Sequence, residues 1–173
     1  MPRIVCIICL GLLSCFSINI SALESDAFIE TFITLNQELD PDLDLVDLRT
    51  QYVALVDTCK KSCEGLTEPS AIIAALNRSL LHERKISYLS NVYWRDASLS
   101  AAVLQKNCNC LAGSTLYVCI GKSLNLPIKM VLSPGHAFAR WDNEQARINI
   151  ETTNKGVHYP DKNYLQGANQ VST

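Results

Sequence analysis

Apolar residues recur at helical spacing through the first half of the chain, which predicts a run of amphipathic helices. The first of these places Phe28, Ile29, Phe32 and Ile33 on one face. Farther along, aromatic and polar residues without periodicity favour a loop. We expect helices over residues 26–39, 45–64 and 69–81, then a loop over 88–96 and a short helix over 99–104.

Turn and capping residues separate these helices. Asp40-Pro41-Asp42 breaks the first helix and can cap the second, because proline does not continue a helix and aspartate accepts hydrogen bonds from helix-start N–H groups. Gly65 is a typical helix stop. Pro69 is typical of a first helical position, so the third helix is expected to begin there.

Residues 111–124 show helical spacing again, and a cysteine stands at the start of this helix. Asn125 and Pro127 mark its end. At a helix N-terminus, free N–H groups and the helix dipole favour a thiolate and can bind an oxyanion. The first turn holds only small residues, Ala112-Gly113-Ser114, so another element can approach it closely. Cys110 is therefore a candidate nucleophile, although most cysteines are core residues.

Three predicted strands follow that helix. Turn residues separate them, and the second and third alternate between two faces, as half-buried strands do. The strands are expected over residues 128–132, 136–141 and 147–151. Helices first and a small antiparallel sheet last indicate an α+β fold.

His136 begins the middle strand and Glu151 ends the third. The start of one antiparallel strand lies beside the end of the next, so these side chains can be neighbours. Asp142 lies at the far end of the hairpin, and Asn149 lacks the charge that stabilises an imidazolium. A thiol, an imidazole and a carboxylate are the components of a catalytic triad. We predict Cys110 as nucleophile, His136 as base and Glu151 as the orienting group.

Several short motifs together resemble the transglutaminase-like superfamily. A Cys opens a helix with a Ser four residues later, a Leu-Pro step leads into a strand, a Pro-Gly-His begins the next strand, and an Asn/Trp-Glu-x-Thr segment ends the third. Here these motifs are Asn109–Tyr117, Leu126-Pro127, Pro134–Trp141 and Asn149–Gly156. The resemblance covers roughly residues 70–165. It looks closest to bacterial proteins that often carry tetratricopeptide-type repeats after the core.

This resemblance implies a papain-like transglutaminase core, with the nucleophile helix packed on the sheet. It also implies the roles given above to Cys110, His136 and Glu151. Family members usually have a glycine two residues before the nucleophile, where this chain has Cys108. Cys108 and Cys110 form a Cys-x-Cys pair. Neighbouring thiols can be oxidised together, which would silence the nucleophile reversibly.

Composition and charge narrow the function classes. With 173 residues, 48% of them hydrophobic, the chain can form one domain with its own core, which we expect over residues 23–173. The formal net charge is −2, and no cluster of Lys and Arg is interleaved with aromatic residues, which argues against nucleic-acid binding. The three histidines show no metal-ligand spacing, so neither a metal nor another cofactor is expected.

The first 22 residues resemble a secretory signal peptide. Arg3 precedes an almost wholly apolar run over residues 4–18, and Ser21-Ala22 precedes the acidic Glu24-Ser25-Asp26. Cleavage after Ala22 would give an exported protein, either periplasmic or extracellular. Two other readings stay open. A degenerate lipobox would leave Cys15 lipidated, or the segment would be retained as a short membrane anchor.

Cysteine usage is compatible with export. Removal of the first 22 residues leaves five of the eight cysteines, an odd number that keeps at least one thiol unpaired in an oxidising compartment. Cys59 and Cys63 stand one helical turn apart, and a bridge between them is possible.

The sequence thus predicts an exported thiol enzyme that transfers or hydrolyses an acyl group of a protein or peptide substrate. The alternative is a module of the same fold that binds or assembles without catalysis. Contact between the Cys110 sulfur and a His136 ring nitrogen separates the two, because only catalysis requires it. Asn91 or Asn107 could supply a further oxyanion donor. Contact with a membrane is expected only if the N-terminal segment is retained or lipidated.

Overall fold

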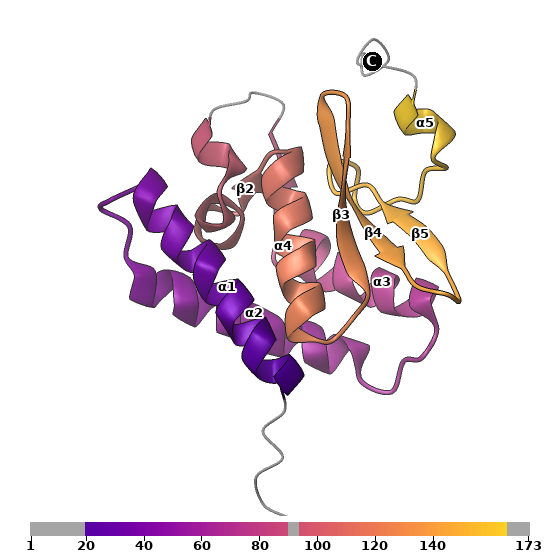
Figure 1. Cartoon of the computed structure of the whole chain (residues 1–173), viewed down its shortest axis with the longest axis horizontal. Helices are drawn as coiled ribbons and strands as arrows, with labels where there is room; N and C mark the ends of the chain where they lie inside the picture. The colour runs from indigo at the N-terminus through magenta and orange to yellow at the C-terminus, as the bar shows by residue number, and fades with distance from the viewer. Residues whose placement is uncertain (1–19, 90–93, 166–173) are drawn as a thin grey trace, which may run out of the picture.

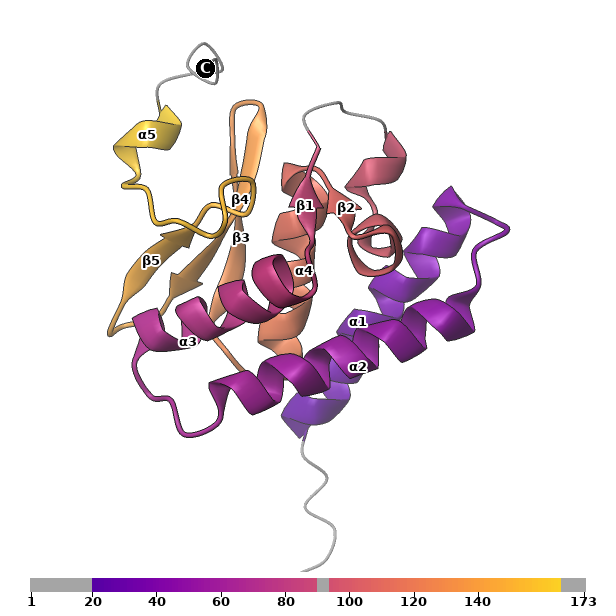
Figure 2. The same ribbon diagram turned by 180° about the vertical axis from the view of Figure 1, so that it is seen from behind.

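The computed structural model describes residues 20–89 and 94–165, in which helices and a small sheet surround one central helix (Figure 1). The central helix is α4 (Cys110–Ser123). Three helices precede it and lie across it, as the view from behind shows (Figure 2). They are α1 (Ile20–Leu39), α2 (Leu45–Cys63) and α3 (Pro69–Asn77).

The predicted helices are confirmed, with one correction at a cap. Asp44, not Asp40 or Asp42, caps α2, because its carboxylate accepts from the N–H groups of Val46 and Asp47 at 2.9 and 3.0 Å. Asp40 instead closes the end of α1 through its own N–H. The sequence correctly predicted that the helix is interrupted here. This segment contains three aspartates, Asp40, Asp42 and Asp44, and only the structure shows which of them caps α2.

The segment between α3 and α4 is more regular than its composition suggests. A π-helical turn, η1 (Arg78–Glu83), extends α3, and a second one, η3 (Ala101–Gln105), forms most of the predicted short helix. The prediction of a loop over residues 88–96 was wrong in part. That range holds the end of a short strand, β1 (Ser87–Tyr88), and most of a 3₁₀ turn, η2 (Trp94–Ala97). Strand β1 pairs in parallel with β2 (Asn107–Cys108), immediately before α4.

The antiparallel sheet matches its prediction closely. It has the order β3–β4–β5, from β3 (Ile128–Ser133), β4 (His136–Asp142) and β5 (Arg147–Ile150). Beyond β5 the backbone of Glu151 forms a single bridge with Val157, and a short helix, α5 (Lys162–Leu165), follows. The C-terminal part of the described chain therefore returns to the sheet.

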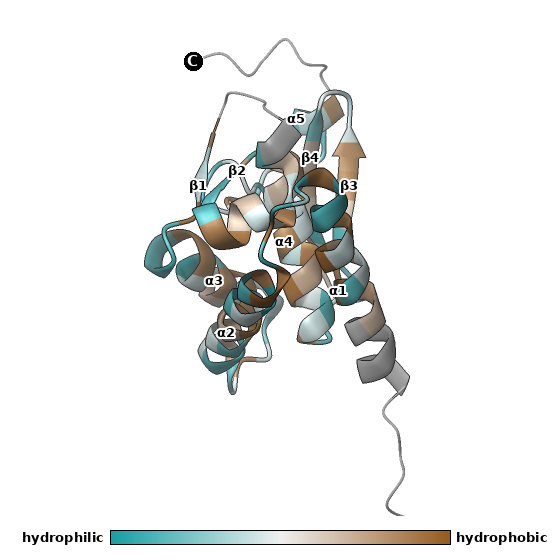
Figure 3. Cartoon of the chain, turned by 90° about the vertical axis from the view of Figure 1, so that its left-hand side faces the viewer, coloured by the Kyte–Doolittle hydropathy of each residue, from teal (hydrophilic) through white to brown (hydrophobic). Residues whose placement is uncertain are grey.

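Helix α4 fills the middle of the core. Side chains from every surrounding layer are buried against it, and the apolar colouring of α4 is visible in Figure 3. Gly121 is required where β3 crosses, because a Cβ there would lie 2.7 Å from the Cβ of Ile128. The largest fully buried side chains include Ile33, Leu48, Leu76, Leu116, Tyr117, Phe138 and Ile150. The position of Cys110 is thus fixed by a helix held on all sides.

The predicted signal peptide, apart from its last three residues, lies outside the described residues, as do Cys15 and Asn91. Its predicted cleavage site after Ala22 falls in the first turn of α1. Within residues 20–89 and 94–165, no helix is long and apolar enough to cross a bilayer.

Candidate active site

Cys110 is the first residue of α4, and the residues around it explain why the helix begins there. Asn109 is extended, and its side-chain oxygen accepts from the Ala112 N–H at 3.0 Å. The Asn109 N–H in turn donates to the Asp96 carbonyl at 3.0 Å. The Ser114 hydroxyl donates to the Cys110 carbonyl at 2.7 Å, which accounts for the serine of the motif. The cap and first turn therefore hold the nucleophile candidate in place.

The expected close approach to the first turn of α4 is present at Gly113. A Cβ there would lie 3.0 Å from Thr152 Oγ1 and 3.4 Å from Cys108 Sγ. Thr152 immediately follows Glu151, so the space left by the glycine brings the end of the third strand toward the start of α4. A larger residue at position 113 would push the two apart.

The Cys110 thiol is partly exposed and lies close enough to the His136 side chain to interact with it. That interaction is the main reason why the pKa of Cys110 is lowered. Burial opposes the shift, and the backbone N–H groups of Ala137 and Leu111 support it. The surroundings of the thiol therefore shift its ionisation toward the thiolate, the reactive form of a cysteine nucleophile.

His136 begins β4, immediately after Gly135, whose positive φ of 72° makes the hairpin turn. Its Nε2 lies 2.8 Å from Glu151 Oε2, which leaves Nδ1 for the thiol. The hydrogen bonds to Cys110 and Glu151 raise the pKa of His136 to about 9. The two pKa shifts, down for the thiol and up for the imidazole, both run in the direction of a thiolate–imidazolium pair.

Glu151 is buried, with only 4% of its surface exposed. Burial alone would raise the pKa of its carboxyl, but hydrogen bonds from His136 and Thr153 outweigh burial and lower it. Thr153 donates twice to Oε1, from its N–H at 3.1 Å and its hydroxyl at 2.6 Å. Each carboxylate oxygen therefore has a partner. The register places Glu151 diagonally from His136, since Ala139 pairs with Ile150.

Tyr164 of α5 covers this pair from the other side, a contact that sequence patterns did not indicate. Its ring stacks on Phe138 with centroids 3.8 Å apart, and lies nearly parallel to the His136 ring at 6.1 Å. Its hydroxyl is buried without a well-formed hydrogen bond to any described residue. Burial and the nearby Glu151 charge raise the pKa of Tyr164. The stacked rings of Tyr164 and Phe138 thus stand beside the imidazole.

Asn77 was also missed, and it anchors the loop that follows Glu151. It accepts from the Tyr117 hydroxyl of α4 at 2.7 Å and donates to the Gly156 carbonyl at 3.1 Å. Gly156 has a φ of 73°, and a Cβ there would collide with Asn77. One side chain thus joins α3, α4 and the loop. The only sequence signal was a polar residue within an apolar helical run.

Asn149 and Asn107 have other partners. Asn149 accepts from Arg140 at 2.6 Å and donates to the Tyr159 carbonyl at 2.7 Å, so it holds the C-terminal segment on the sheet. The Asn107 side-chain oxygen accepts from the Ser87 hydroxyl at 2.9 Å, within the β1–β2 pair. These contacts give Asn149 a structural role. The side-chain oxygen of Asn107 is engaged within the β1–β2 pair, away from His136.

The other described cysteines differ from Cys110. All five are free thiols, so Cys59 and Cys63 form no bridge. Burial raises the pKa of Cys108 to about 11 and that of Cys119 to about 12. Cys108 is buried and its thiol donates to the Ser87 carbonyl at 3.7 Å. Among the described residues, no group of three His, Cys, Asp or Glu side chains is placed to hold a metal ion.

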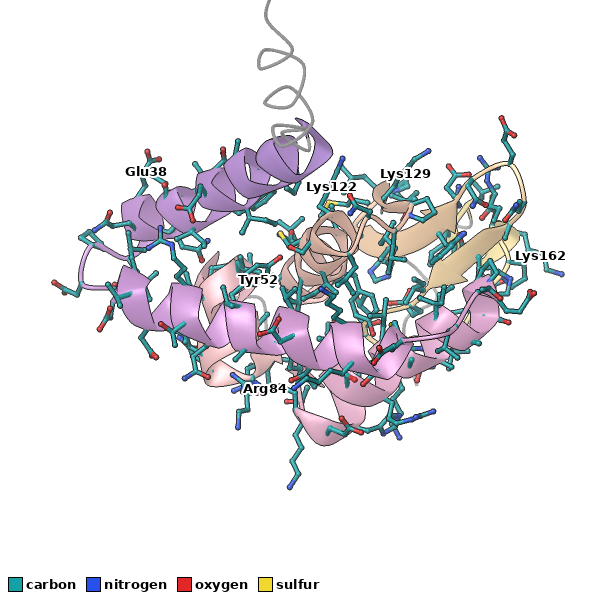
Figure 4. All side chains as sticks on the ribbon, turned by 90° about the horizontal axis from the view of Figure 1, so that it is seen from below. Glu38, Tyr52, Arg84, Lys122, Lys129 and Lys162 are labelled. Carbon is teal, nitrogen blue, oxygen red and sulfur yellow. The ribbon has the colours of Figure 1, made fainter. Side chains whose placement is uncertain are left out.

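A cavity of about 430 Å³ lies at the opposite end of α4, between α1, α2 and the helix C-terminus. Tyr52 and Lys122 lie on its wall and are labelled in the view from below (Figure 4). The cavity has an apolar floor and none of the predicted site residues.

The family of the chain follows from its sequence profile. The sequence profile of the transglutaminase-like superfamily matches residues 47–167. A solved structure, described as the crystal structure of a TGase, is similar with a TM-score of 0.49 and 12% identity; the likeness covers 73% of this chain and 38% of that one. Comparison with curated proteins gave no match. Because the profile spans more than half of the chain, the protein belongs to the transglutaminase-like superfamily.

Proposed function

We propose that the protein is a transglutaminase-like cysteine enzyme that cleaves or transfers an acyl group through Cys110, His136 and Glu151. The observation that carries this proposal is the 2.8 Å contact between His136 Nε2 and the buried Glu151 carboxylate, with the partly exposed Cys110 thiol close enough to the same imidazole to have its pKa lowered. A binding module that kept only the fold would not need a thiol of lowered pKa in contact with the histidine. The geometry therefore favours catalysis over the non-catalytic alternative.

In the first half-reaction the Cys110 thiolate attacks the carbonyl carbon of an amide, and a sulfur–carbon bond forms. N–H groups at the start of α4 stabilise the developing oxyanion. The His136 imidazolium then gives its proton to the departing amine as the carbon–nitrogen bond breaks. Glu151 holds the imidazole by Nε2 and stabilises its positive charge. The products are a thioester on Cys110 and a free amine.

In the second half-reaction His136, now neutral, takes a proton from water or from an acceptor amine. The activated oxygen or nitrogen attacks the thioester, the carbon–sulfur bond breaks and the thiolate–imidazolium pair is restored. Water gives hydrolysis, and an amine gives acyl transfer. The substrate is proposed to be a protein or peptide, since its amide groups match this chemistry.

The test combines labelling with turnover. Iodoacetamide should alkylate Cys110 at pH 6, and Cys110→Ala should lose both the label and any amidase or transamidase activity toward dye-labelled casein. A mixture with and without a primary amine, such as dansyl cadaverine, separates transfer from hydrolysis. Equal labelling of Cys110 and Cys63 at pH 6 would contradict the nucleophile assignment, because burial raises the pKa of Cys63.

We also propose that the protein acts outside the cytoplasm. The basic and apolar start of the chain, followed by small and then acidic residues, supports a cleaved export signal. Mass spectrometry of the protein from its native host should find a mature form that begins at Leu23. A lipid adduct on Cys15 would favour the lipoprotein alternative, and an intact N-terminus would exclude cleavage.

A further inference from the structure

Strand β1 has an unused hydrogen-bonding edge beside the candidate nucleophile. In its parallel pair with β2, the Ser87 N–H donates to the Lys106 carbonyl at 2.9 Å and the Leu89 N–H donates to the Cys108 carbonyl at 3.0 Å. Groups alternate along a strand, so the N–H and C=O of Tyr88 point away from β2. No backbone hydrogen bond within the described residues uses these two Tyr88 groups.

This edge lies close to the reacting groups. Tyr88 pairs with Cys108, two residues before the nucleophile, and Figure 2 shows β1 and β2 near the start of α4. The side-chain pKa of Tyr88 is raised by burial and by the charges of Cys110 and Glu151, which places its ring near both. A chain bound along Tyr88 would therefore pass the thiol.

Four large apolar or aromatic side chains are exposed on the elements that carry the site. Tyr88 and Leu89 belong to the edge, Leu111 follows the nucleophile, and Leu132 stands on β3; they are 42, 36, 41 and 71% exposed. Leu132 is tied to the site because it pairs with Ala137, the residue that follows His136 on β4. Exposed apolar side chains gathered at one place mark a binding surface.

We infer that the site takes its acyl donor as an extended peptide, paired with the main chain of Tyr88 and carrying an apolar side chain next to the reacting carbonyl, against Leu111 and Leu132. This inference rests on the proposed function. An extended peptide presents an N–H and a C=O on the same side at every second residue, which complements the two Tyr88 groups that face away from β2. A charged peptide side chain would find no counter-charge among the four exposed residues.

The experiment uses three peptide chloromethyl ketones, which alkylate a thiolate at the position of the substrate carbonyl with loss of chloride. The apolar probe is acetyl-valyl-leucyl chloromethyl ketone, the polar probe is its seryl-seryl analogue, and the third is the apolar probe N-methylated at the valyl nitrogen. The leucyl carbonyl takes the reacting position, so the valyl residue is the one whose N–H and C=O can both face Tyr88. Labelling of Cys110 in the full protein is followed by mass spectrometry. Each rate is divided by the iodoacetamide rate of the same protein, which reports thiol reactivity without recognition.

We expect the apolar probe to label Cys110 at least about tenfold faster than the polar probe. N-methylation should slow it roughly two- to tenfold, the value of one hydrogen bond. Leu132→Ser should remove most of the preference for the apolar probe. The matched control is Val46→Ser, because Val46 on α2 is also 71% exposed but lies far from Cys110 in the sequence and outside the site. It should keep the preference.

Each contrary result has a distinct meaning. Normal iodoacetamide labelling with equal rates for apolar and polar probes, or no effect of N-methylation, would overturn the inference and leave the proposed function intact. Failure of iodoacetamide and of all three probes at Cys110 would overturn the proposed function itself. A dimer in solution that Leu132→Ser dissociates would assign the edge to a second copy of the chain and exclude a peptide site.

Discussion

The two ends of helix α4 use their polar groups in different ways. At the N-terminal end, Cys110, His136 and Glu151 are at least partly buried; His136 is hydrogen-bonded to Glu151 and also lowers the pKa of Cys110. At the C-terminal end, the charged groups stay at the surface, as in the exposed ion pair between Glu30 and Arg49, and an open cavity separates the helices. One helix thus carries a dense polar network at one end and loose packing at the other.

The difference shows where the fold is constrained. Burial of a charged group costs free energy unless every oxygen and nitrogen finds a partner, and around Glu151 they do. Such an arrangement tolerates little change. An exposed ion pair contributes little to folding, and a cavity already lacks contacts, so the far end should tolerate substitution. The predictions below compare matched changes at the two ends.

The largest difference is expected for two glutamates. Glu151→Gln removes the charge that stabilises the His136 imidazolium and disturbs its orientation, so turnover should fall about 10²–10⁴-fold without loss of the fold. Glu30→Gln breaks the ion pair at the cavity end and should leave turnover unchanged. Steady-state rates with circular dichroism as a check of folding decide this. If Asn149→Ala abolished activity while Glu151→Gln did not, the third member of the triad would be Asn149.

The second comparison is between two thiols of the same helix. Cys110 has a lowered pKa and is partly exposed, whereas burial raises the pKa of Cys119 to about 12. Because only thiolates react, iodoacetamide at pH 6 should label Cys110 more than about 100-fold faster than Cys119. Peptide mapping after timed exposure measures both rates. Labelling at similar rates would mean that the ion pair with His136 does not form in solution.

The third prediction concerns pH. The pKa of His136 is raised from 6.5 to about 9, so its contribution to the ion pair is complete below 6.5 and is lost as pH rises through 9. Since the imidazolium must protonate the leaving amine, kcat/KM should fall about tenfold per pH unit above 9. Glu151→Gln should move this limb to lower pH. If the fall of kcat/KM stayed at the same pH in that variant, Glu151 would not be a cause of the raised pKa of His136.

The loss of stability at acidic pH depends on Glu151. Its pKa is lowered, so its stabilising contribution is present above about 4.5 and is lost as pH falls through its folded value. Thermal unfolding followed from pH 7 to pH 3 should show a loss of stability in this range for the natural protein and a smaller loss for Glu151→Gln. Arg49→Gln, at the cavity end, should follow the natural protein.

Local sequence signals predicted much of the structure around the N-terminal end of α4, where the candidate site lies. Cys110, His136 and Glu151 were found because each stands at the end of an element, where the pattern of apolar residues changes. Helix, turn and strand periodicity are properties of neighbouring residues, so they can be recognised in the sequence without knowledge of the tertiary structure. The same signals gave the strands of the sheet to within one residue of their observed ends.

Long-range contacts were not predictable in the same way. Asn77, Thr153 and Tyr164 act on the site through side-chain contacts. Asn77 and Tyr164 contact residues that are tens of positions away in the sequence, and neither belongs to a motif. The π-helical turn η1 depends on a hydrogen bond from Arg84 to Ser79, five residues apart, which follows packing and not periodicity. Strands β1 and β2 are two residues each, too short to produce a pattern.

The smallest and most discriminating comparison uses two buried tyrosines that each make one hydroxyl hydrogen bond. Tyr117→Phe leaves Asn77 Oδ1 without its donor and loosens the loop that follows Glu151. The free energy of unfolding should fall by about 1–3 kcal/mol, which lowers Tm by roughly 2–4 °C per kcal/mol. Turnover should fall severalfold. Tyr52→Phe removes the bond to Ser123, 2.9 Å long, beside the cavity, where water can replace it. It should cost about 1 kcal/mol or less, with no change in turnover. Calorimetry and steady-state rates measure both. An equal loss of activity in the two variants would mean that the ends of α4 are coupled through the helix, and that the preorganisation of Cys110 extends to the cavity.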